Sequence, residues 1–159
     1  MKISKIKKKI KNYIFLCIGA CHNDNILKLK NKHKFFRTNP VYSESRPGGV
    51  SANIATNLRY FNKNIHLFSL LPSKDFKKII TKKKIKYHYI SNKKNDSFYT
   101  AVINKSGKLI LGLASNETYE KLKKINNSLI NRCIKKNSYI ILDLCFNESL
   151  TNNIINYYY

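Results

Sequence analysis

Continuous apolar runs recur along the chain and predict buried strands. Each run is short, rich in β-branched, aromatic or leucine residues, and bounded by glycine, proline or polar residues. Such runs are typical of parallel strands that are covered on both faces. The predicted strands are residues 13–18, 65–71, 87–90 and 139–144, the last of which contains Asp143.

Helical periodicity occurs between these runs. Apolar residues within 50–61 recur at spacings i, i+4, i+5, i+8 and i+11, which places them on one face of a helix, and residues 117–136 have a similar spacing. The strongly basic residues 74–86 predict a solvated helix or loop, and a last helix is expected from about Ser149. Strands that alternate with helices predict an α/β fold built on a mainly parallel sheet.

Two further stretches predict a smaller antiparallel unit. Residues 25–47 are polar and contain two prolines, which exclude a long helix and favour short extended segments. Residues 97–103 and 108–113 flank a polar turn that ends at Gly107, where a positive φ angle is expected. We therefore expect a β-hairpin over about residues 97–113.

The composition adds a strong positive charge. The 159 residues include 31 Lys+Arg against 8 Asp+Glu, a formal net charge of +23. However, 27 of the 31 basic residues are Lys, and Lys, Asn and Ile together fill 69 of the 159 positions. A groove that binds phosphate or guanine favours the planar fork of arginine, so we attribute most of the charge to lysines on solvated faces. Nucleic acid is not the expected partner, but a basic nucleic-acid-binding protein stays open as an alternative.

Composition also excludes two classes of protein. With 43% hydrophobic residues, 11 Tyr and 8 Phe, the chain can form a core and is not a disordered tail. It contains no run of about 18 uncharged apolar residues, which excludes a membrane-spanning helix. The sequence therefore predicts a folded domain with no membrane partner.

The N-terminal residues allow two interpretations. Residues 1–12 form a basic extension, and the apolar residues 13–20 precede Cys21, as in a lipoprotein signal peptide that is cleaved before a cysteine. The apolar run has only about eight residues, near the lower limit for such a signal. It suits the first buried strand equally well. A secreted lipoprotein cleaved before Cys21 therefore stays open as a second alternative.

The four cysteines do not have the spacing of a disulfide framework, and three of them lie in apolar stretches. Cys17, Cys21 and His22 are neighbours in the sequence, but no second Cys or His pair with zinc-finger spacing follows them. We therefore expect buried thiols and no metal site. Reduced cysteines favour a cytoplasmic location. The cysteines are Cys17, Cys21, Cys133 and Cys145.

Two groups of residues indicate ligand chemistry. Asp24 lies in the predicted turn after the first strand, at the carboxyl end of the sheet, where α/β folds bind ligands. Gly48 and Gly49 precede a predicted helix with Asn53 in its first turn, so backbone amides can approach a ligand closely. A carboxylate and an amide side chain suit a polyhydroxylated ligand. The structural alternative is that the glycines form a plain turn and that Asp24 is a cap.

Residues 48–58, Gly-Gly-Val-Ser-Ala-Asn-Ile-Ala-Thr-Asn-Leu, resemble the first signature of the PfkB-type (ribokinase-family) carbohydrate and nucleoside kinases, G-G-x-x-x-N-x-A-x-x-L. Gly19, followed five residues later by Asp24, resembles their opening strand and substrate-binding aspartate. The resemblance extends over about residues 13–150 in the expected order. Pseudouridine kinases are the most similar members, through residues 46–50, 99–109, 112–114 and 117–120.

The resemblance implies a ribokinase-like, Rossmann-like fold, with helices on both faces of a mainly parallel sheet and a small antiparallel β lid. It implies ATP-dependent phosphoryl transfer to a sugar hydroxyl, with ATP and Mg²⁺ as cofactors. The sugar or nucleoside, pseudouridine among the candidates, would be held by Asp24, Gly48, Gly49 and Asn53. The hairpin over about 97–113 would contribute to the lid, through which we expect a homodimer.

The chain also departs from the family pattern. Residues 61–62 are Phe-Asn where a Leu-Gly turn is common, and residues 72–74 are Pro-Ser-Lys where a Gly-Asp turn is common. The second family signature, Gly-Ala-Gly-Asp, to which the resemblance assigns the anion hole and the catalytic base, is absent. We therefore expect residues 13–159 to be the substrate-binding half alone. This half would lack catalytic residues and the nucleotide site and would be inactive by itself. It would be either a truncated or decaying gene product, or half of a split enzyme whose C-terminal half is encoded separately.

Overall fold

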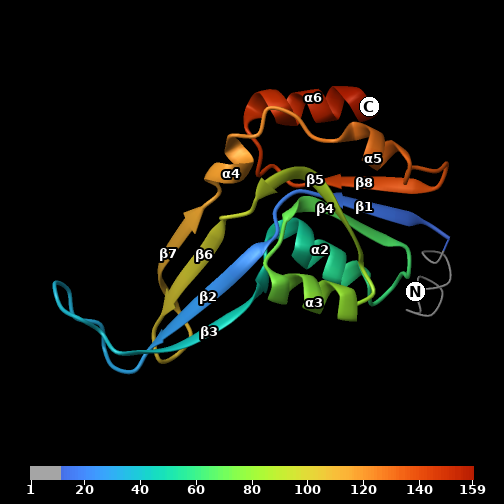
Figure 1. The fold of residues 1–159 in the computed structure, drawn as a ribbon. Helices are drawn as coiled ribbons and strands as arrows, with labels where there is room; N and C mark the ends of the chain where they lie inside the picture. The colour runs from blue at the N-terminus through green and yellow to red at the C-terminus, as the bar shows by residue number, and fades with distance from the viewer. Residues whose placement is uncertain (1–11) are drawn as a thin grey trace.

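The computed structural model describes residues 12–159, so the predicted basic extension lies, apart from its last residue, outside the described residues. The described strands form two sheets (Figure 1). The strands are β1 (Ile14–Ile18), β2 (His22–Leu29), β3 (Val41–Gly48), β4 (Ile65–Leu71), β5 (Lys86–Lys94), β6 (Phe98–Ile103), β7 (Leu109–Ser115) and β8 (Ser138–Leu142). The helices are α2 (Val50–Leu58), α3 (Lys74–Lys82), α4 (Glu117–Glu120), α5 (Asn127–Asn131) and α6 (Glu148–Tyr158).

The first sheet is parallel throughout and has the strand order β5-β4-β1-β8. All four strands coincide with the apolar runs of the sequence, although β5 extends to Lys94, beyond the predicted end at residue 90. Helices cover both faces of this sheet: α2 and α3 lie on one side, and α5 and α6 on the other (Figure 1). The predicted α/β architecture is therefore confirmed.

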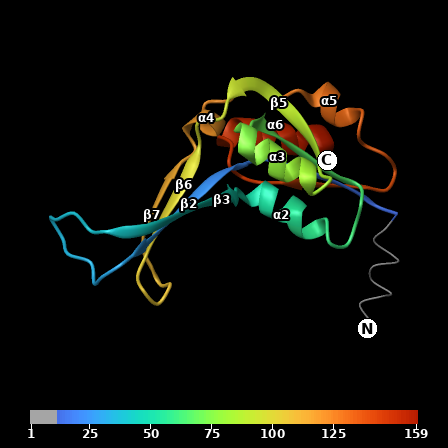
Figure 2. The ribbon, with the colours of Figure 1, turned by 60° about the horizontal axis from the view of Figure 1, so that its bottom comes forward.

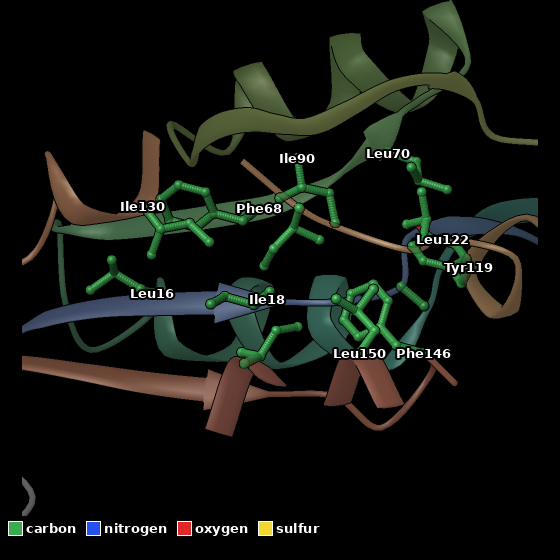
Figure 3. Close-up of a cluster of buried hydrophobic side chains, with 13 residues drawn as sticks. Leu16, Ile18, Phe68, Leu70, Ile90, Tyr119, Leu122, Ile130, Phe146 and Leu150 are labelled. Atoms are coloured by element: carbon green, nitrogen blue, oxygen red, sulfur yellow. The ribbon is translucent and has the colours of Figure 1, made fainter. Parts of the chain in front are cut away.

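Two hydrophobic cores, one on each face of the sheet, explain why its strands are apolar without alternation. In β1, Leu16 and Ile18 point to one core and Cys17 to the other, because successive strand residues face opposite sides. Figure 3 shows the larger core, in which side chains of β1, β4 and β5 meet those of the C-terminal helical segments. Its labelled residues are Leu16, Ile18, Phe68, Leu70, Ile90, Tyr119, Leu122, Ile130, Phe146 and Leu150.

The second sheet is the lid, and it extends away from the helices (Figure 2). Its strand order is β3-β2-β6-β7, with β2 parallel to β6 and the two outer pairs antiparallel. The predicted hairpin is confirmed as β6 and β7, with Gly107 at φ +84° in the turn. However, the lid is larger than that hairpin, because β2 and β3 are eight-residue strands rather than short extended segments.

The lid strands β2 and β3 lack continuous apolar runs because the lid is poorly covered by other elements. Five of the eight β3 residues are exposed, so its polar residues lose little hydration there. Pro47 lies within β3 and would break a central strand, but β3 is at the edge of the sheet, where a missing amide hydrogen is tolerated. Because β3 is polar and contains a proline, the sequence did not predict a long strand there.

The helical spacing over residues 117–136 does not form one helix. The segment contains α4 and α5, separated by irregular backbone. Asn126 breaks it: its side chain accepts a hydrogen bond from Leu129 N at 3.2 Å and caps a new helix, while its own N–H donates to the Ile90 carbonyl of β5. The apolar residues still reach the core, since Leu122 and Ile130 are both buried.

Side-chain caps fix where α3 and α6 begin. The Ser73 side chain caps α3 by accepting a hydrogen bond from Phe76 N at 3.2 Å. The basic stretch is therefore a helix, and Phe76 is buried. Asn147 caps α6 by accepting from Leu150 N at 2.9 Å, close to the predicted start at Ser149. None of the helices within residues 12–159 has the length and apolar character needed to cross a bilayer.

Candidate functional site

The two sheets meet at the short loop that joins β1 to β2. Gly19 in this loop has φ +145°, and a Cβ on it would overlap Asp143 and lie 2.7 Å from Ser51 Oγ. Gly49 has φ +93°, and a Cβ there would lie 2.5 Å from the Ala20 carbonyl oxygen. Both positions require glycine, because other residues rarely adopt these angles and no space exists for a side chain. The glycines allow the loop, the start of α2 and the end of β8 to converge.

Asp24 lies in β2, which corrects its predicted place in a turn after the first strand. The chain pairs with β3 from His22 onward, so the turn ends earlier than the polar sequence suggests. The register sets His22 opposite Gly48, which brings Asp24 diagonally across from Gly48. A Cβ on Gly48 would overlap the Asp24 carboxyl group. Two of the four predicted site residues are therefore in contact.

The Asp24 carboxylate is enclosed but lacks a hydrogen bond at one oxygen. Its side chain is 16% exposed, and Oδ1 is buried without a hydrogen-bond partner among the described residues. His22 Nδ1 lies 3.1 Å from Oδ1, but it is not oriented for a hydrogen bond and is also buried without one. Buried polar atoms of native proteins nearly always have a partner. Asp24 Oδ1 is therefore a buried acceptor without a donor, on the side of β2 that faces Gly48.

The start of α2 holds the other two predicted residues. Gly49 is the N-cap, and its carbonyl accepts a hydrogen bond from Asn53 N at 2.9 Å. The Asn53 side chain is exposed in the first turn, and no hydrogen bond within residues 12–159 joins it to Asp24. Ser51 was missed by the sequence analysis, yet its Oγ is buried without a hydrogen-bond partner. The first turn of α2 thus adds an unpaired hydroxyl near the loop.

Asp143 directly follows β8, which ends at Leu142, whereas the sequence placed Asp143 inside the predicted strand 139–144; it links β8 to the same loop. Its Oδ2 accepts a hydrogen bond from Ala20 N at 3.1 Å, and its N–H donates to the Ile18 carbonyl at 2.9 Å. In the sheet, β1 lies between β4 and β8, so the order of the chain reverses beside β1. Open α/β sheets bind ligands at the carboxyl ends of strands at such a reversal.

A buried polar network holds the loop to the sheet. The Tyr119 hydroxyl accepts from Cys21 N at 3.0 Å and lies 2.7 Å from Ser69 Oγ. The Tyr87 hydroxyl lies 2.7 Å from Cys21 Sγ, and Asn95 Nδ2 donates to the Cys21 carbonyl. Burial raises the pKa of Cys21, Tyr87 and Tyr119, so all three keep their protons at neutral pH. The network is therefore structural and fully protonated.

Sequence reasoning did not identify this network. Cys21 and Tyr119 are 98 positions apart, and Cys21 and Asn95 are 74 apart, so no local spacing connects them. The available signal was weaker: Cys21 ends an apolar run and was expected to be buried, which the structure confirms. Burial also raises the pKa of Cys17 to about 12, so neither thiol near His22 is ionised at neutral pH.

A cleft of about 240 Å³ lies on the opposite face of β2. Asn23 and Asn25 face it, alternating along the strand with Asp24, and Asn95 and Ser97 line its floor. None of the four predicted site residues lines this cleft. The predicted site is therefore the Asp24 side of β2, near the loop and α2, and not this cleft.

Comparisons with known proteins identify the fold. No protein-family model and no curated protein matches the sequence. Solved structures do match: ribokinase from Giardia lamblia has a TM-score of 0.71 and 13% identity over 92% of this chain and 46% of its own. The chain has a ribokinase-like fold. A nucleoside kinase from Methanocaldococcus jannaschii (TM-score 0.56, 14% identity, 84% of this chain, 52% of its own) has a similar fold. Ribokinase from Arabidopsis thaliana, solved with ribose and ATP, also has a similar fold (TM-score 0.61, 12% identity, 86% of this chain, 47% of its own).

The chain spans about half the length of these solved structures. In this ribokinase-like fold, β8 is an edge strand of the described sheet, beside a groove of about 630 Å³. The groove lies between β8 and α6 and has a largely aromatic and aliphatic lining. It is lined by Ser138, Tyr139, Ile140, Leu142, Leu144, Ile154, Ile155, Tyr158 and Tyr159.

The ribokinase-like fold also brings together one set of metal-ligating side chains within residues 12–159. His66 of β4, His88 of β5 and Cys133 after α5 place their ligand atoms within 4.8 Å of one another. In the sequence, the neighbours of this kind are Cys17, Cys21 and His22. His66, His88 and Cys133 are too far apart in the sequence for a motif to connect them, and only the strand order brings them together.

Proposed function

We propose that this chain is the substrate-binding half of a PfkB-type carbohydrate or nucleoside kinase, which binds a sugar or nucleoside such as pseudouridine for ATP-dependent phosphorylation of a hydroxyl. The observation that supports this proposal most strongly is the enclosed Asp24 carboxylate. Its Oδ1 lacks a hydrogen-bond donor and lies against Gly48, at the meeting point of lid and sheet. A sugar hydroxyl supplies the missing donor.

The neighbouring residues fit the same ligand. A carboxylate accepts hydrogen bonds from two adjacent hydroxyls, and hydrogen bonds to a charged group contribute about 1.5–3 kcal/mol each. Gly48 and Gly49 let β3 and the start of α2 pack closely against Asp24 and the loop, and the exposed Asn53 amide can donate to or accept from further hydroxyls. In this proposal Asp24, Gly48, Gly49 and Asn53 bind and orient the sugar. None of them transfers phosphate.

Residues 12–159 do not fit the triphosphate of ATP. A triphosphate needs a cradle of backbone amides and positive charge. The two carboxylates nearest the loop, Asp24 and Asp143, repel it, and Gly48 and Gly49 already pack against Asp24 and Ala20. The other glycines of the lid, Gly107 and Gly112, lie in the β6–β7 hairpin. We therefore assign ATP, Mg²⁺ and the catalytic base to a second half, without which this chain is inactive.

Two surfaces suit partners of this kind. The free edge of β8 and its apolar groove suit further strands and helices of a C-terminal half. On the lid, β7 exposes a row of leucines that suits a second copy of the lid. The exposed leucines are Leu109, Leu111 and Leu113. We place the protein in the cytoplasm on the basis of its free thiols.

The fold does not favour the alternatives. Cleavage before Cys21 would remove β1, a strand that pairs with both β4 and β8 and carries the centre of both cores. For nucleic acid, lysines and aromatic rings should interleave on one face. The two lysine–ring contacts of the described residues, Lys30 with Tyr42 and Lys77 with Tyr89, lie instead on the lid and on α3.

Isothermal titration of the 159-residue chain with ribose and with pseudouridine tests the proposal. We expect binding of at least one of them, and a loss of at least about tenfold in affinity for Asp24→Asn and for Asn53→Ala. Asp75→Asn is the matched control, because Asp75 is an exposed residue of α3. If neither ligand binds, or if Asp24→Asn binds like the control, the proposed substrate site is wrong.

The proposed second half has its own test. An adjacent open reading frame that encodes Gly-Ala-Gly-Asp should yield a protein that copurifies with this chain and restores sugar-dependent ATP consumption. Leu144→Asp, at an exposed position of the β8 groove, should abolish copurification while ribose or pseudouridine binding by this chain persists. Copurification that is unchanged by Leu144→Asp would show that the groove is not the docking surface.

A further inference from the structure

The cluster of His66, His88 and Cys133 lies at the opposite end of the sheet from Asp24. His66 is the second residue of β4 and His88 the third of β5, so both are near the amino ends of parallel strands. The Asp24 site is at the carboxyl ends of the same sheet, beyond β1. The cluster is therefore separate from the proposed sugar site and has no part in it.

The sheet holds the two imidazoles on one face. Phe68 is opposite His88 in the β4–β5 register, and His66 precedes Phe68 by two residues, so all three rings point to the same side. The rings of His66 and His88 are nearly parallel, 5.0 Å apart and inclined by 5°, and Phe68 stacks on His88 at 4.6 Å. Cys133, which packs on the edge of the larger core, completes the cluster from above the sheet.

The distances are close to those of a tetrahedral metal site. His66 Nδ1 and His88 Nε2 are 2.9 Å apart, and all three ligand atoms lie within 4.8 Å of one another. Zn–N distances of about 2.0–2.1 Å and a Zn–S distance of about 2.3 Å place two nitrogens about 3.4 Å apart and nitrogen and sulfur about 3.6 Å apart. The nitrogens need to separate by about 0.5 Å and the sulfur to move by at most about 1.2 Å. Small side-chain rotations provide both.

The donor set selects the type of metal. Two imidazole nitrogens and a thiolate suit zinc, whereas Mg²⁺ and Ca²⁺ prefer oxygen ligands. Burial and the neighbouring Lys86 lower the pKa of both histidines, so their rings are neutral and have lone pairs to offer. Lys86 and Arg132 are the cations nearest the cluster; their charge opposes the burial that raises the pKa of Cys133. Lys86 is exposed, so its ammonium can move away from a bound cation.

We propose that His66 Nδ1, His88 Nε2 and Cys133 Sγ bind one Zn²⁺ ion, with a water molecule as the fourth ligand. Binding removes the thiol proton of Cys133 and breaks the hydrogen bond between the two imidazoles. The ion joins β4 and β5, which already pair as parallel strands, to the segment after α5, where Cys133 packs on the edge of the larger core. Zinc therefore stabilises the α/β half of the molecule and does not take part in sugar binding.

Titration of the untagged, metal-free 159-residue chain with Zn²⁺, and separately with Co²⁺ as a spectroscopic probe, tests this site. We expect one ion per chain, a thiolate-to-cobalt charge-transfer band, release of about one proton, and a higher midpoint of thermal unfolding with Zn²⁺. Substitution of residues that only support a ligand reduces metal affinity 10–100-fold, so Cys133→Ser and His88→Gln should each reduce it by at least about 100-fold.

Cys145→Ser is the matched control, because Cys145 is a second half-buried thiol packed against the same core. It should leave the stoichiometry and the charge-transfer band unchanged. Circular dichroism verifies that Cys133→Ser and His88→Gln are folded, and Cys133→Ser is nearly isosteric. The site is overturned if the wild-type chain binds no Zn²⁺ at a one-to-one ratio. It is equally overturned if folded Cys133→Ser keeps the cobalt band, or if Cys145→Ser loses it. Loss of zinc should leave ribose or pseudouridine binding intact, which separates this result from the test of Asp24.

Discussion

The two sheets of this molecule differ in how far other elements cover them and in how apolar their strands are. The β5-β4-β1-β8 sheet is covered on both faces, and its strands β1 and β4 are almost entirely apolar. The lid sheet exposes most of β3 and β7, and its strands are polar or mixed. Burial fixes which residues the first sheet tolerates, whereas backbone pairing alone maintains much of the second. The first sheet therefore provides most of the buried core, and the junction with the second contains buried polar atoms without hydrogen-bond partners.

The largest expected difference between the sheets is in core deletions. Phe68→Ala removes a fully buried ring of β4 and should lower the free energy of unfolding by about 3–5 kcal/mol. Leu111→Ala removes a half-exposed residue of β7 and should change it by less than about 0.5 kcal/mol. Urea denaturation of both variants measures the difference. Equal losses would mean that the lid is covered in solution, as a lid-mediated dimer would require.

The second-largest loss of stability should come from the polar network that joins the sheets. Tyr119→Phe keeps the ring in the core but leaves Cys21 N and Ser69 Oγ with one partner fewer. Loss of a buried hydrogen-bond partner costs about 1–3 kcal/mol, which urea denaturation would measure. Tyr60→Phe is the matched control, since Tyr60 is exposed, and should be nearly neutral. A neutral Tyr119→Phe would show that the network does not stabilise the junction.

Substitution of Gly48, on the lid side of the site, should reduce stability less. Gly48→Ala places a methyl group against the Asp24 carboxyl, and since Asp24 is partly exposed and can shift, the loss of stability should be about 1 kcal/mol. Sugar affinity should fall at least about tenfold, because the displaced carboxylate loses hydrogen bonds to the ligand. Gly107→Ala is the control: it is strained at φ +84° but touches nothing within 4 Å. It should cost similar stability and leave affinity unchanged, and an equal loss of affinity in both variants would contradict the Asp24 site.

The smallest effect should come from the edge of the lid. Pro47→Ala keeps β3 in place, because an edge strand does not need the rigid ring, and should cost less than about 1 kcal/mol through the more flexible unfolded chain. Hydrogen exchange would follow the new amide, together with those of β1. Rapid exchange in β3 and slow exchange in β1 is the expected result. Strong protection of β3 would indicate that another chain covers this edge.

The sequence-based predictions were more accurate for the buried sheet than for the lid. Residues 13–18, 65–71 and 139–144 were assigned as strands because burial on both faces leaves a local signal, a continuous apolar run. The strands β2 and β3 were underestimated because exposed pairing leaves no such signal, and Pro47 argued against one. Asn126 divided the predicted helix over 117–136, since its capping bond and its contact with Ile90 depend on β5 lying nearby.

The candidate site shows the same limit at the level of side chains. Gly48, Gly49 and Asn53 were recognisable because a glycine pair before a helix is a local pattern. That Asp24 faces Gly48 depends on the β2–β3 register, which no local pattern specifies. Ser51 looked like an ordinary helix residue until its hydroxyl was found buried beside Gly19 and Asp143.

By itself, the sequence determined the α/β class, the order of the buried strands and the positions of the glycines, because hydrophobic period and backbone conformation are properties of neighbouring residues. Only the tertiary structure decided which distant residues meet. It brought Cys21 to Tyr119, Asp24 to Gly48, and His66 to His88 and Cys133. The physical reason is that such contacts depend on strand order and pairing register. These minimise the free energy of the whole fold, and no single segment contains them.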